Sequence, residues 1–154
     1  MIRRAIKEDA DRILELLVEV CNVHAKLRAD LFVAGGTKYN KEELYKIMED
    51  DNKPVFVCIN DKGILAGYAF CVVNEVKGDN LVSHKNLYID DICVSSECRR
   101  EHVGTKLYEH VIAFAKSIGC YNVTLNVWEG NDAARKFYEN CGMKVQKTVL
   151  ETVI

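Results

Sequence analysis

The residues between positions 95 and 104 have the types and spacing of a turn that could bind an anion. Two arginines, Arg99 and Arg100, follow an apolar segment of strand character and precede Gly104, near which a helical apolar pattern begins. The first N–H groups of a helix have no partner within the helix and lie at the positive end of its dipole. A basic turn at that place can hold a phosphate on backbone donors, and the alternative is a solvated basic loop.

Two stretches of the chain resemble the signatures of the GNAT superfamily of N-acetyltransferases. The stretch VSSECRREHVGTKLYEHV resembles the acyl-CoA-binding motif Gln/Arg-x-x-Gly-x-Gly/Ala, with Arg99 to Gly104 in the same frame. The stretch NVWEGNDAARKFYENCGM is similar to the second signature, an asparagine followed seven residues later by tyrosine and then by a glycine-hydrophobic pair. These places are filled by Asn131, Tyr138, Gly142 and Met143. The signatures occur in the family's order, and the resemblance covers most of the chain after Val55.

The resemblance implies that acetyl-CoA is the co-substrate. It places the pantetheine and the acetyl carbonyl on backbone amides at the end of a strand, and the pyrophosphate on the basic turn. The implied cofactor-binding residues are Ile92, Cys93, Val94, Arg99, Arg100, Glu101, His102, Val103, Gly104, Thr105 and Asn131. His102 stands where the motif usually has its first glycine, a residue that permits unusual backbone angles, but a histidine still contributes a backbone N–H.

Acetyl transfer from a thioester to an amine needs a neutral amine, a polarised carbonyl and a proton for the leaving thiolate. The resemblance assigns the acid to Tyr138, which matches the tyrosine that hydrogen-bonds the sulfur in the family. The alternative is that Tyr138 packs beside Phe137 as a core aromatic residue.

The general base is less clear from the sequence. Asn126 stands where N-terminal acetyltransferases of the ribosomal-protein type have a glutamate, and an amide cannot accept a proton at neutral pH. Asp90 and Asp91 are similar to the acidic pair of spermidine/spermine acetyltransferases. Strand alternation sends them to opposite faces of a sheet, so only one of them can easily face the acceptor cleft. The resemblance favours Asp90 as that residue. The alternative is that both carboxylates are structural and an ordered water carries the proton.

Hydrophobic periodicity predicts the elements that would position these residues. Strands are expected at residues 2–6, 55–59, 64–73, 87–94, 121–128 and 144–152. Helices are expected on the apolar stripe of residues 13–20, which could continue toward residue 31, and at residues 40–49, 103–119 and 131–142. This β-α-α-β-β-β-α-β-α-β order predicts an α/β (α+β) fold with a central mixed sheet flanked by helices, in a single domain over residues 1–154. The resemblance implies that this is the GNAT fold.

Composition limits the partners and the compartment. A net charge of −2 over 154 residues gives no general attraction to nucleic acid or anionic membranes. The seven cysteines form no CxxC pair and no zinc-type cluster, so no metal is expected and a reducing compartment is favoured. No segment has the pattern of a signal peptide or a membrane span, so we expect a cytoplasmic protein.

The predicted function is transfer of the acetyl group of acetyl-CoA to a primary amine of a small molecule or peptide. Direct transfer is expected, because neither Cys93 nor Cys98 has an evident histidine partner. The competing hypothesis is a non-catalytic acyl-CoA-binding or sensing module. Dimers are frequent among proteins that the chain resembles, so a homodimer is compatible with the resemblance.

Overall fold

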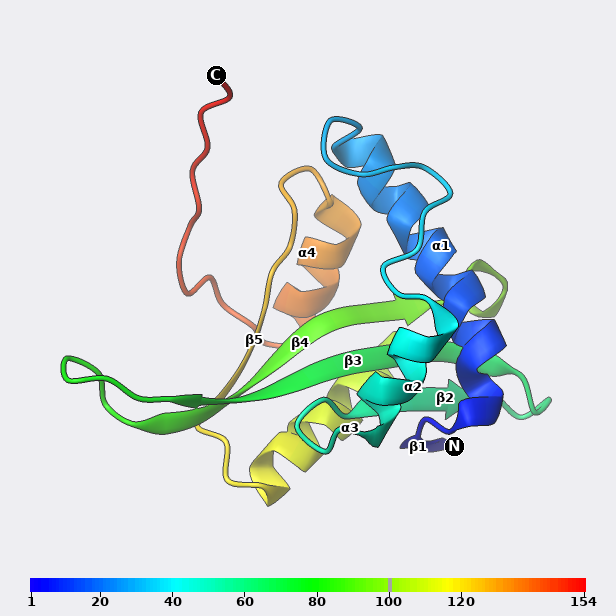
Figure 1. Ribbon diagram of the computed structural model, residues 1–154, viewed down its shortest axis with the longest axis horizontal. Coiled ribbons are helices and arrows are strands. Elements are labelled where there is room, and N and C mark those ends of the chain that lie inside the picture. The colour runs from blue at the N-terminus through cyan, green and yellow to red at the C-terminus, as the bar shows by residue number, and fades with distance from the viewer. Residues whose placement is uncertain (100) are drawn as a thin grey trace.

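The chain folds into one five-stranded sheet with helices on both faces (Figure 1). The structure is a computed structural model that describes residues 1–99 and 101–154. The strands are β1 (Ile2–Arg4), β2 (Val55–Ile59), β3 (Leu65–Val76), β4 (His84–Val94) and β5 (Asn122–Leu125). The helices are α1 (Ala10–Leu27), α2 (Lys41–Glu49), α3 (Val103–Ser117) and α4 (Asp132–Asn140), with two short 3-10 turns, η1 (Lys7–Asp9) and η2 (Ser96–Cys98).

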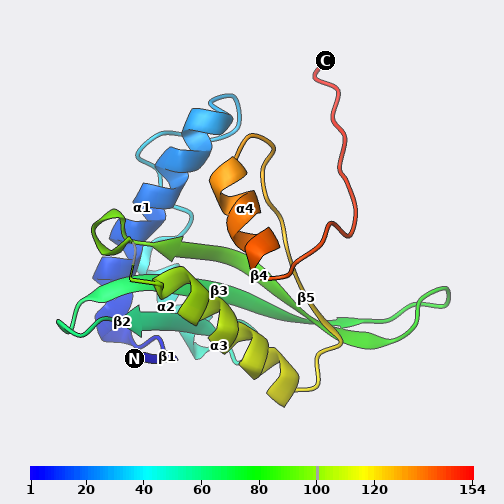
Figure 2. The ribbon, with the colours of Figure 1, turned by 180° about the vertical axis from the view of Figure 1, so that it is seen from behind.

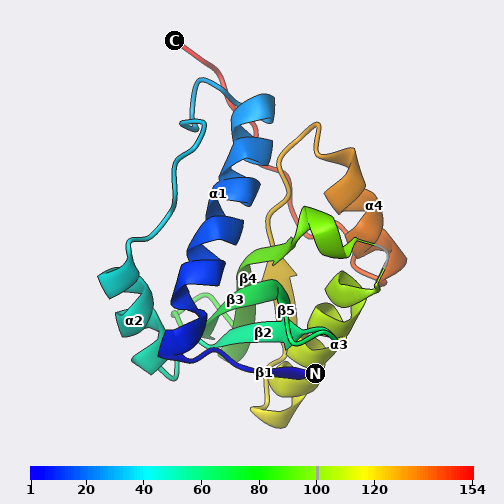
Figure 3. The same ribbon diagram turned by 90° about the vertical axis from the view of Figure 1, so that its right-hand side faces the viewer.

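The strands lie in the order β1-β2-β3-β4-β5, antiparallel except for the parallel pair β4 and β5. This arrangement confirms the predicted mixed sheet with flanking helices. Helices α1 and α2 lie on one face, and α3 and α4 lie on the other side in the view along the sheet (Figure 3). In the described part of the chain, no helix combines the length and the hydropathy needed to cross a membrane.

Each face of the sheet buries its own apolar cluster. On one face, α1 and α2 place residues such as Leu16 and Leu44 against Val57 and Phe70. On the other face, α3 packs its apolar stripe, including Leu107, against the opposite side of the same strands. The predicted stripes of α1, α2 and α3 therefore face the sheet, as amphipathic helices require.

A local signal accounts for the start of α2. The Asn40 side chain accepts a hydrogen bond from the Glu43 N–H at 2.9 Å, and the Glu43 carboxylate accepts one from the Asn40 N–H at 2.9 Å. This capping box satisfies two donors at the start of α2. Helix α1 ends at Leu27 and does not continue toward residue 31.

The hairpin of β3 and β4 is longer than the sequence predicts. Residues 74–76 pair with residues 84–86, so the predicted loop of residues 77–85 is reduced by two positions. Two of these added pairs are formed by polar residues, Asn74 with Asn86 and Glu75 with Lys85, and the pairs belong to a ribbon that extends beyond the helices (Figures 1 and 2). A period-two apolar pattern cannot reveal such pairs, because the one buried residue among them, Asn86, is polar.

The prediction of a strand at residues 144–152 is wrong. Residues 144–152 were expected to form a strand, but residues 144–154 form neither helix nor strand and lead away from the body (Figures 1 and 2). β5 is also shorter than predicted, at Asn122–Leu125 rather than residues 121–128. No other strand pairs with β5 within the described residues, so β5 has an open edge.

A β-bulge changes the side-chain alternation of β4 at Asp90. Phe70 pairs with Asp91 and Cys71 pairs with Ile89, which leaves Asp90 as the extra residue. Ile89 packs in the α3 cluster, whereas Cys93 packs in the cluster of α1 and α2. Residues four apart in a regular strand share a face, so one inserted residue explains the switch.

Gly67 is required where β3 passes beneath the start of α3. A Cβ at this position would lie 2.5 Å from the Cys93 carbonyl oxygen and 3.1 Å from Val103 Cγ1. We expect Gly67→Ala to lower the free energy of unfolding by about 1–3 kcal/mol, as overpacking does. Gly78→Ala is the control, because its nearest contact would be an ordinary 3.4 Å to Leu81. Urea unfolding of both variants checks this, and equal midpoints would contradict it.

Candidate active site

A cavity opens where β4 and β5 separate. The two strands pair only from Asn86 with Asn122 to Ile89 with Leu125, and β4 then continues alone to Val94 on that side. A cavity of ≈ 570 Å³ lies there and reaches between α1, the loop of residues 31–38 and α4. Alternate backbone groups of residues 90–94 face away from β3, so this strand end has hydrogen-bonding capacity to offer a ligand.

The bulge brings both acidic residues to this one cavity. Asp90 and Asp91 both line it, and their carboxylates bond to residues of the aromatic group formed by Tyr39, Tyr68 and Phe70. The expectation that they face opposite sides of the sheet is therefore wrong. The physical reason is the extra residue in β4, which resets the alternation between them.

Asp91 is the more buried carboxylate of the two. The Tyr68 hydroxyl donates to Asp91 Oδ2 at 2.6 Å. Burial raises the pKa of Asp91, and the Tyr68 hydrogen bond opposes this only in part. A carboxylate with a raised pKa can accept a proton near neutral pH better than a solvated one.

Asp90 is paired with a cation. Lys38 Nζ lies 2.6 Å from Asp90 Oδ2, and the Tyr39 hydroxyl donates to the same oxygen at 3.2 Å. Burial lowers the pKa of Lys38, but the hydrogen bond to Asp90 and its charge outweigh this, so the pKa is raised. Lys38 therefore stays charged and occupies one oxygen of Asp90.

Tyr138 lines the same cavity from α4. Its ring contacts Phe137 at 5.0 Å and Tyr108 at 6.5 Å between centroids. Burial, and then the negative charge of Asp91, raise the pKa of Tyr138. The phenol therefore keeps its proton at neutral pH and can act as a donor.

The basic turn leads into α3 through a left-handed residue. His102 has φ 55° and is the residue before the first turn of α3, and it is exposed to solvent together with Arg99 and Glu101. The backbone conformation that a motif glycine would favour is thus adopted by a histidine. Arg100 lies outside the described residues.

The strain at His102 gives a stability prediction. The left-handed region costs a non-glycine residue roughly 1–2 kcal/mol, so we expect His102→Gly to raise the free energy of unfolding by about 1 kcal/mol. His102→Val should lower it, because a β-branched residue tolerates positive φ poorly. Denaturant unfolding measures both changes. A destabilised His102→Gly variant would instead mean that the imidazole makes a contact worth more than the strain.

Gly104 allows α3 and α4 to approach each other beside the turn. A Cβ on Gly104 would meet Phe137 Cζ at 3.3 Å and Val94 Cγ2 at 3.5 Å. Val103 is buried beneath the helix, so it can serve a ligand through its backbone N–H and not its side chain. The N–H groups of Val103, Gly104 and Thr105 lie in the first turn of α3, where an α-helix supplies no carbonyl partner.

The other predicted cofactor residues lie on the strand end and at the start of α4. Ile92 and Asn131 line the cavity, and the Asn131 side chain also accepts a hydrogen bond from the Ala134 N–H at 3.3 Å. Cys93 is buried and donates to the Leu16 carbonyl at 3.6 Å. Burial, followed by the charge of Asp91, raises the pKa of Cys93 to about 12, so its thiol stays protonated.

Aromatic and polar side chains form the other cavity walls. The Phe32 ring lies 5.0 Å from the His24 ring and 5.5 Å from the Trp128 ring, and all three residues line the cavity. Asn126 also lines it and donates to the Tyr88 hydroxyl at 3.2 Å. Lys38 was missed altogether, because no local pattern relates it to Asp90, 52 residues away.

The residues present fit an acyl-CoA ligand in three respects. These are a strand end without a β5 partner, a left-handed turn residue near the exposed Arg99, and a helix N-terminus that follows this turn. The cavity itself reaches along this strand end as far as Ile92. Within residues 1–99 and 101–154, no three His, Cys, Asp or Glu side chains are grouped so as to hold a metal ion.

Comparisons with known proteins agree with this geometry. Residues 23–143 match the model of the acetyltransferase (GNAT) family. The probable N-acetyltransferase san of Drosophila melanogaster is 31% identical over 136 residues, which cover 79% of this chain and 72% of that protein. The thialysine N-epsilon-acetyltransferase of Bos taurus is 28% identical over 152 residues, covering 92% and 82%.

A solved structure shares the fold over the whole chain. A mutant of the BH1408 protein from Bacillus halodurans superposes with a TM-score of 0.95 at 24% identity, covering 100% of this chain and 99% of that one. The family match spans more than half of the chain, and the Drosophila melanogaster relative is similar over 79% of it. The chain therefore belongs to the GNAT family of acetyltransferases and is an acetyl-CoA-dependent N-acetyltransferase.

Proposed function

We propose that the enzyme transfers the acetyl group of acetyl-CoA directly to a primary amine of a small molecule or peptide. The observation that carries this proposal is that Asp90, Asp91 and Tyr138 line the same cavity, at the point where β4 and β5 separate. Proton-accepting and proton-donating groups thus share one space, as acyl transfer to an amine requires.

Asp91 is the proposed proton acceptor. Its carboxylate is partly buried and has a raised pKa, whereas Asp90 is bound by the Lys38 ammonium. Asp91 would take the proton of the acceptor ammonium, directly or through a water, and leave a neutral amine. This proposal differs from the expectation of Asp90, which rested on the family resemblance and on the assumption that only one of the two aspartates faces the cavity.

Tyr138 is the proposed proton donor. Acetyl-CoA supplies a thioester when bound, and the sulfur leaves as the amine attacks. The raised pKa of Tyr138 keeps its hydroxyl protonated for this step. Backbone N–H groups at the end of β4 would hold the acetyl oxygen, and the turn with Arg99, His102 and the N–H groups of Gly104 and Thr105 would hold the pyrophosphate.

Direct transfer is supported by the protonated state of the Cys93 thiol. The pKa of Cys93 is raised to about 12, and its Sγ is engaged with the Leu16 carbonyl. A protonated, buried thiol is a poor nucleophile. No histidine is within hydrogen-bonding distance of Cys93 in the described part of the chain, so nothing there activates it.

The proposed acceptor carries a primary ammonium group on an apolar stem. Two carboxylates lie on one side of the cavity, and the rings of His24, Phe32 and Trp128 lie on another. The carboxylates favour a cation, and the rings can cover its apolar part. The Bos taurus relative is named for acetylation of the ε-amine of thialysine, a group of this kind.

The proposed compartment is the cytoplasm. All seven cysteines are unpaired in the structure, and four of them are buried. A reducing compartment keeps thiols in this form.

The test is release of the CoA thiol in the presence of amine panels. The protein is incubated with acetyl-CoA and polyamines, amino acids, aminoglycosides or peptides with free N-termini. We expect thiol release that depends on one amine class and saturates with it. Binding of CoA with no thiol release in any class would instead support the acyl-CoA-binding module.

A further inference from the structure

Lys38 is the only lysine or arginine that lines the active-site cavity within the described residues. It belongs to the loop between α1 and α2, and its Nζ lies 2.6 Å from Asp90 Oδ2. Neither of the two proton transfers proposed for the reaction uses this ammonium. Its place beside the aspartates therefore needs another explanation.

A purely structural role explains the pair of Lys38 and Asp90 poorly. The Tyr39 hydroxyl also donates to Asp90 Oδ2, at 3.2 Å, and Lys38 Nζ lies 5.5 Å from the centre of the Tyr39 ring. The Lys38 side chain is nevertheless 48% exposed. An ion pair with a half-exposed partner contributes little to stability, because water screens it. The ammonium is thus held at the cavity wall in a place where a ligand can reach it.

The charges of the cavity limit how many ammonium groups an acceptor can bring. Asp90 and Asp91 are the two carboxylates among its described lining residues, and Lys38 already neutralises Asp90. One ammonium on the acceptor can pair with Asp91. A second would have to displace Lys38 from Asp90 or lie close to a like charge, and both cost binding free energy.

The same ammonium can bind an anionic group of the acceptor. An ammonium carries three N–H donors, and the bond to Asp90 uses one of them. Lys38 lines the cavity and is half exposed, so the other donors can reach a ligand there. A carboxylate is a strong partner for them, because both groups are charged.

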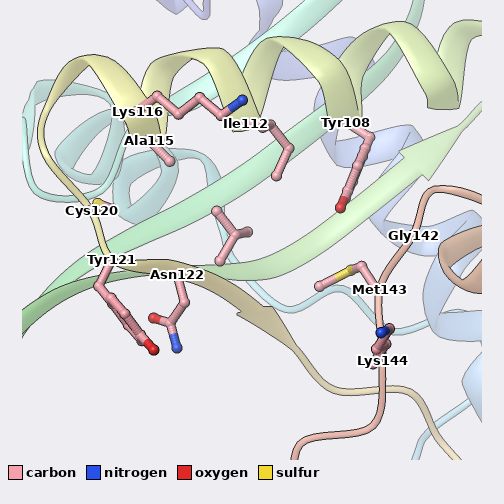
Figure 4. Close-up of a pocket in the computed structure, with 11 residues that line it drawn as sticks. Tyr108, Ile112, Ala115, Lys116, Cys120, Tyr121, Asn122, Gly142, Met143 and Lys144 are labelled. Atoms are coloured by element: carbon pink, nitrogen blue, oxygen red, sulfur yellow. The ribbon is translucent and has the colours of Figure 1, made fainter.

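A second groove of ≈ 300 Å³ lacks this pairing of charges. It lies between α3, the start of β5 and residues 142–144, and Lys116 and Lys144 are among the residues that line it (Figure 4). None of the described residues that line it carries a carboxylate. An ammonium is therefore favoured in the cavity of the two aspartates, where it lies near Lys38.

We propose that Lys38 is a specificity-determining residue, which rejects acceptors with a second ammonium and favours an amine whose apolar stem ends in a carboxylate. The acceptor ammonium binds at Asp91, and the acceptor carboxylate binds Lys38. This class differs from the polyamines, which the acidic pair alone would favour. The inference rests on the proposed function in placing the acceptor amine in this cavity.

Binding of three amines to the complex of the protein with CoA tests this without turnover. Pentylamine, putrescine and δ-aminovalerate carry a primary ammonium on the same tetramethylene stem, which ends in a methyl group, a second ammonium or a carboxylate. Trp128 is the only tryptophan of the chain and lines the cavity, so its fluorescence reports binding. We expect δ-aminovalerate to bind about tenfold or more tightly than putrescine, with pentylamine between them.

Three variants show whether Lys38 causes this preference. Lys38→Met keeps an unbranched side chain and removes the charge, so the preference should disappear or pass to putrescine, whose second ammonium can then pair with Asp90. Lys38→Arg keeps the charge and should keep the wild-type preference. Lys41→Met is the matched control and should also keep it, because the Lys41 ammonium pairs with Asp11 at 2.7 Å and does not line the cavity.

Two results would overturn the role of Lys38. These are binding of putrescine by wild type as tight as that of δ-aminovalerate, and an unchanged preference in Lys38→Met. Binding of none of the three amines would also overturn it, because the acceptor amine would then bind elsewhere. These constants decide on Lys38 even if no amine releases thiol from acetyl-CoA, which is the separate result that would contradict the proposed function.

Discussion

Tyr138→Phe should lower kcat by about 10²–10⁴-fold, the range that positioned proton transfer contributes. The substitution removes only the hydroxyl, so the ring contacts with Phe137 and Tyr108 remain. The departing sulfur then has to leave without a proton from the protein. Steady-state kinetics with a saturating amine measures this loss.

The affinity for CoA and the unfolding midpoint distinguish a loss of catalysis in Tyr138→Phe from misfolding. The dissociation constant for CoA and the unfolding midpoint of Tyr138→Phe should stay close to wild type. Tyr108→Phe is the matched control, since it removes a second phenol that contacts Tyr138 but lies on α3 beside the other groove. Equal losses in both variants, or an unchanged kcat in Tyr138→Phe, would contradict the role of Tyr138 as the acid.

Asp91→Asn should lower kcat/KM by a similar factor of about 10²–10⁴ and change its pH dependence. Only the ionised carboxylate can accept the proton, so wild-type activity should rise with pH through the pKa of Asp91. Burial raises that pKa, and the acid limb should therefore lie above about 3.9, the ordinary value for aspartate. The limb should be absent in Asp91→Asn, whose amide does not titrate.

Asp90→Asn is the control for this prediction. It leaves Asp91 and its bond from Tyr68 in place, so the acid limb should persist, with an altered KM for the amine once Lys38 loses its partner. Loss of the limb in Asp90→Asn and its survival in Asp91→Asn would reverse the assignment. Survival in both would favour an ordered water as the base.

Asp91→Asn should lower activity without lowering the free energy of unfolding near neutral pH. A carboxyl with a raised pKa binds its proton more tightly in the folded state than in the unfolded state. Its contribution to stability is therefore fully present below the unfolded pKa and is lost as pH rises through the folded pKa. Asp91→Asn removes this loss, so the inactive variant should be at least as stable as wild type near neutral pH.

Much of the fold and half of the site could be predicted from local sequence. The caps at Asn40 and Asn131 and the apolar stripes gave the helices, because a helix start and a buried face depend on residues within a few positions. The frame around Gly104 and the spacing from Asn131 to Tyr138 identified the family for the same reason.

Features that depend on pairing between distant segments could not be predicted. The bulge at Asp90 is a property of the register between β3 and β4, and it overturned the expected separation of Asp90 and Asp91. The ion pair of Lys38 with Asp90 joins a loop to a strand 52 residues away. The strand pattern of residues 144–152 concerns backbone groups that have no strand partner within the described residues.

Quantifying acetylated amine against released CoA thiol in a single turnover tests the central claim most directly. With enzyme in excess over acetyl-CoA and a primary amine present, we expect one acetyl-amine for each thiol, no acetylated protein at any time, and a much slower reaction in Tyr138→Phe. Thiol release without acetyl-amine, or an acetylated protein that precedes the product, would contradict direct transfer between the amine and the thioester in the cavity of Asp91 and Tyr138.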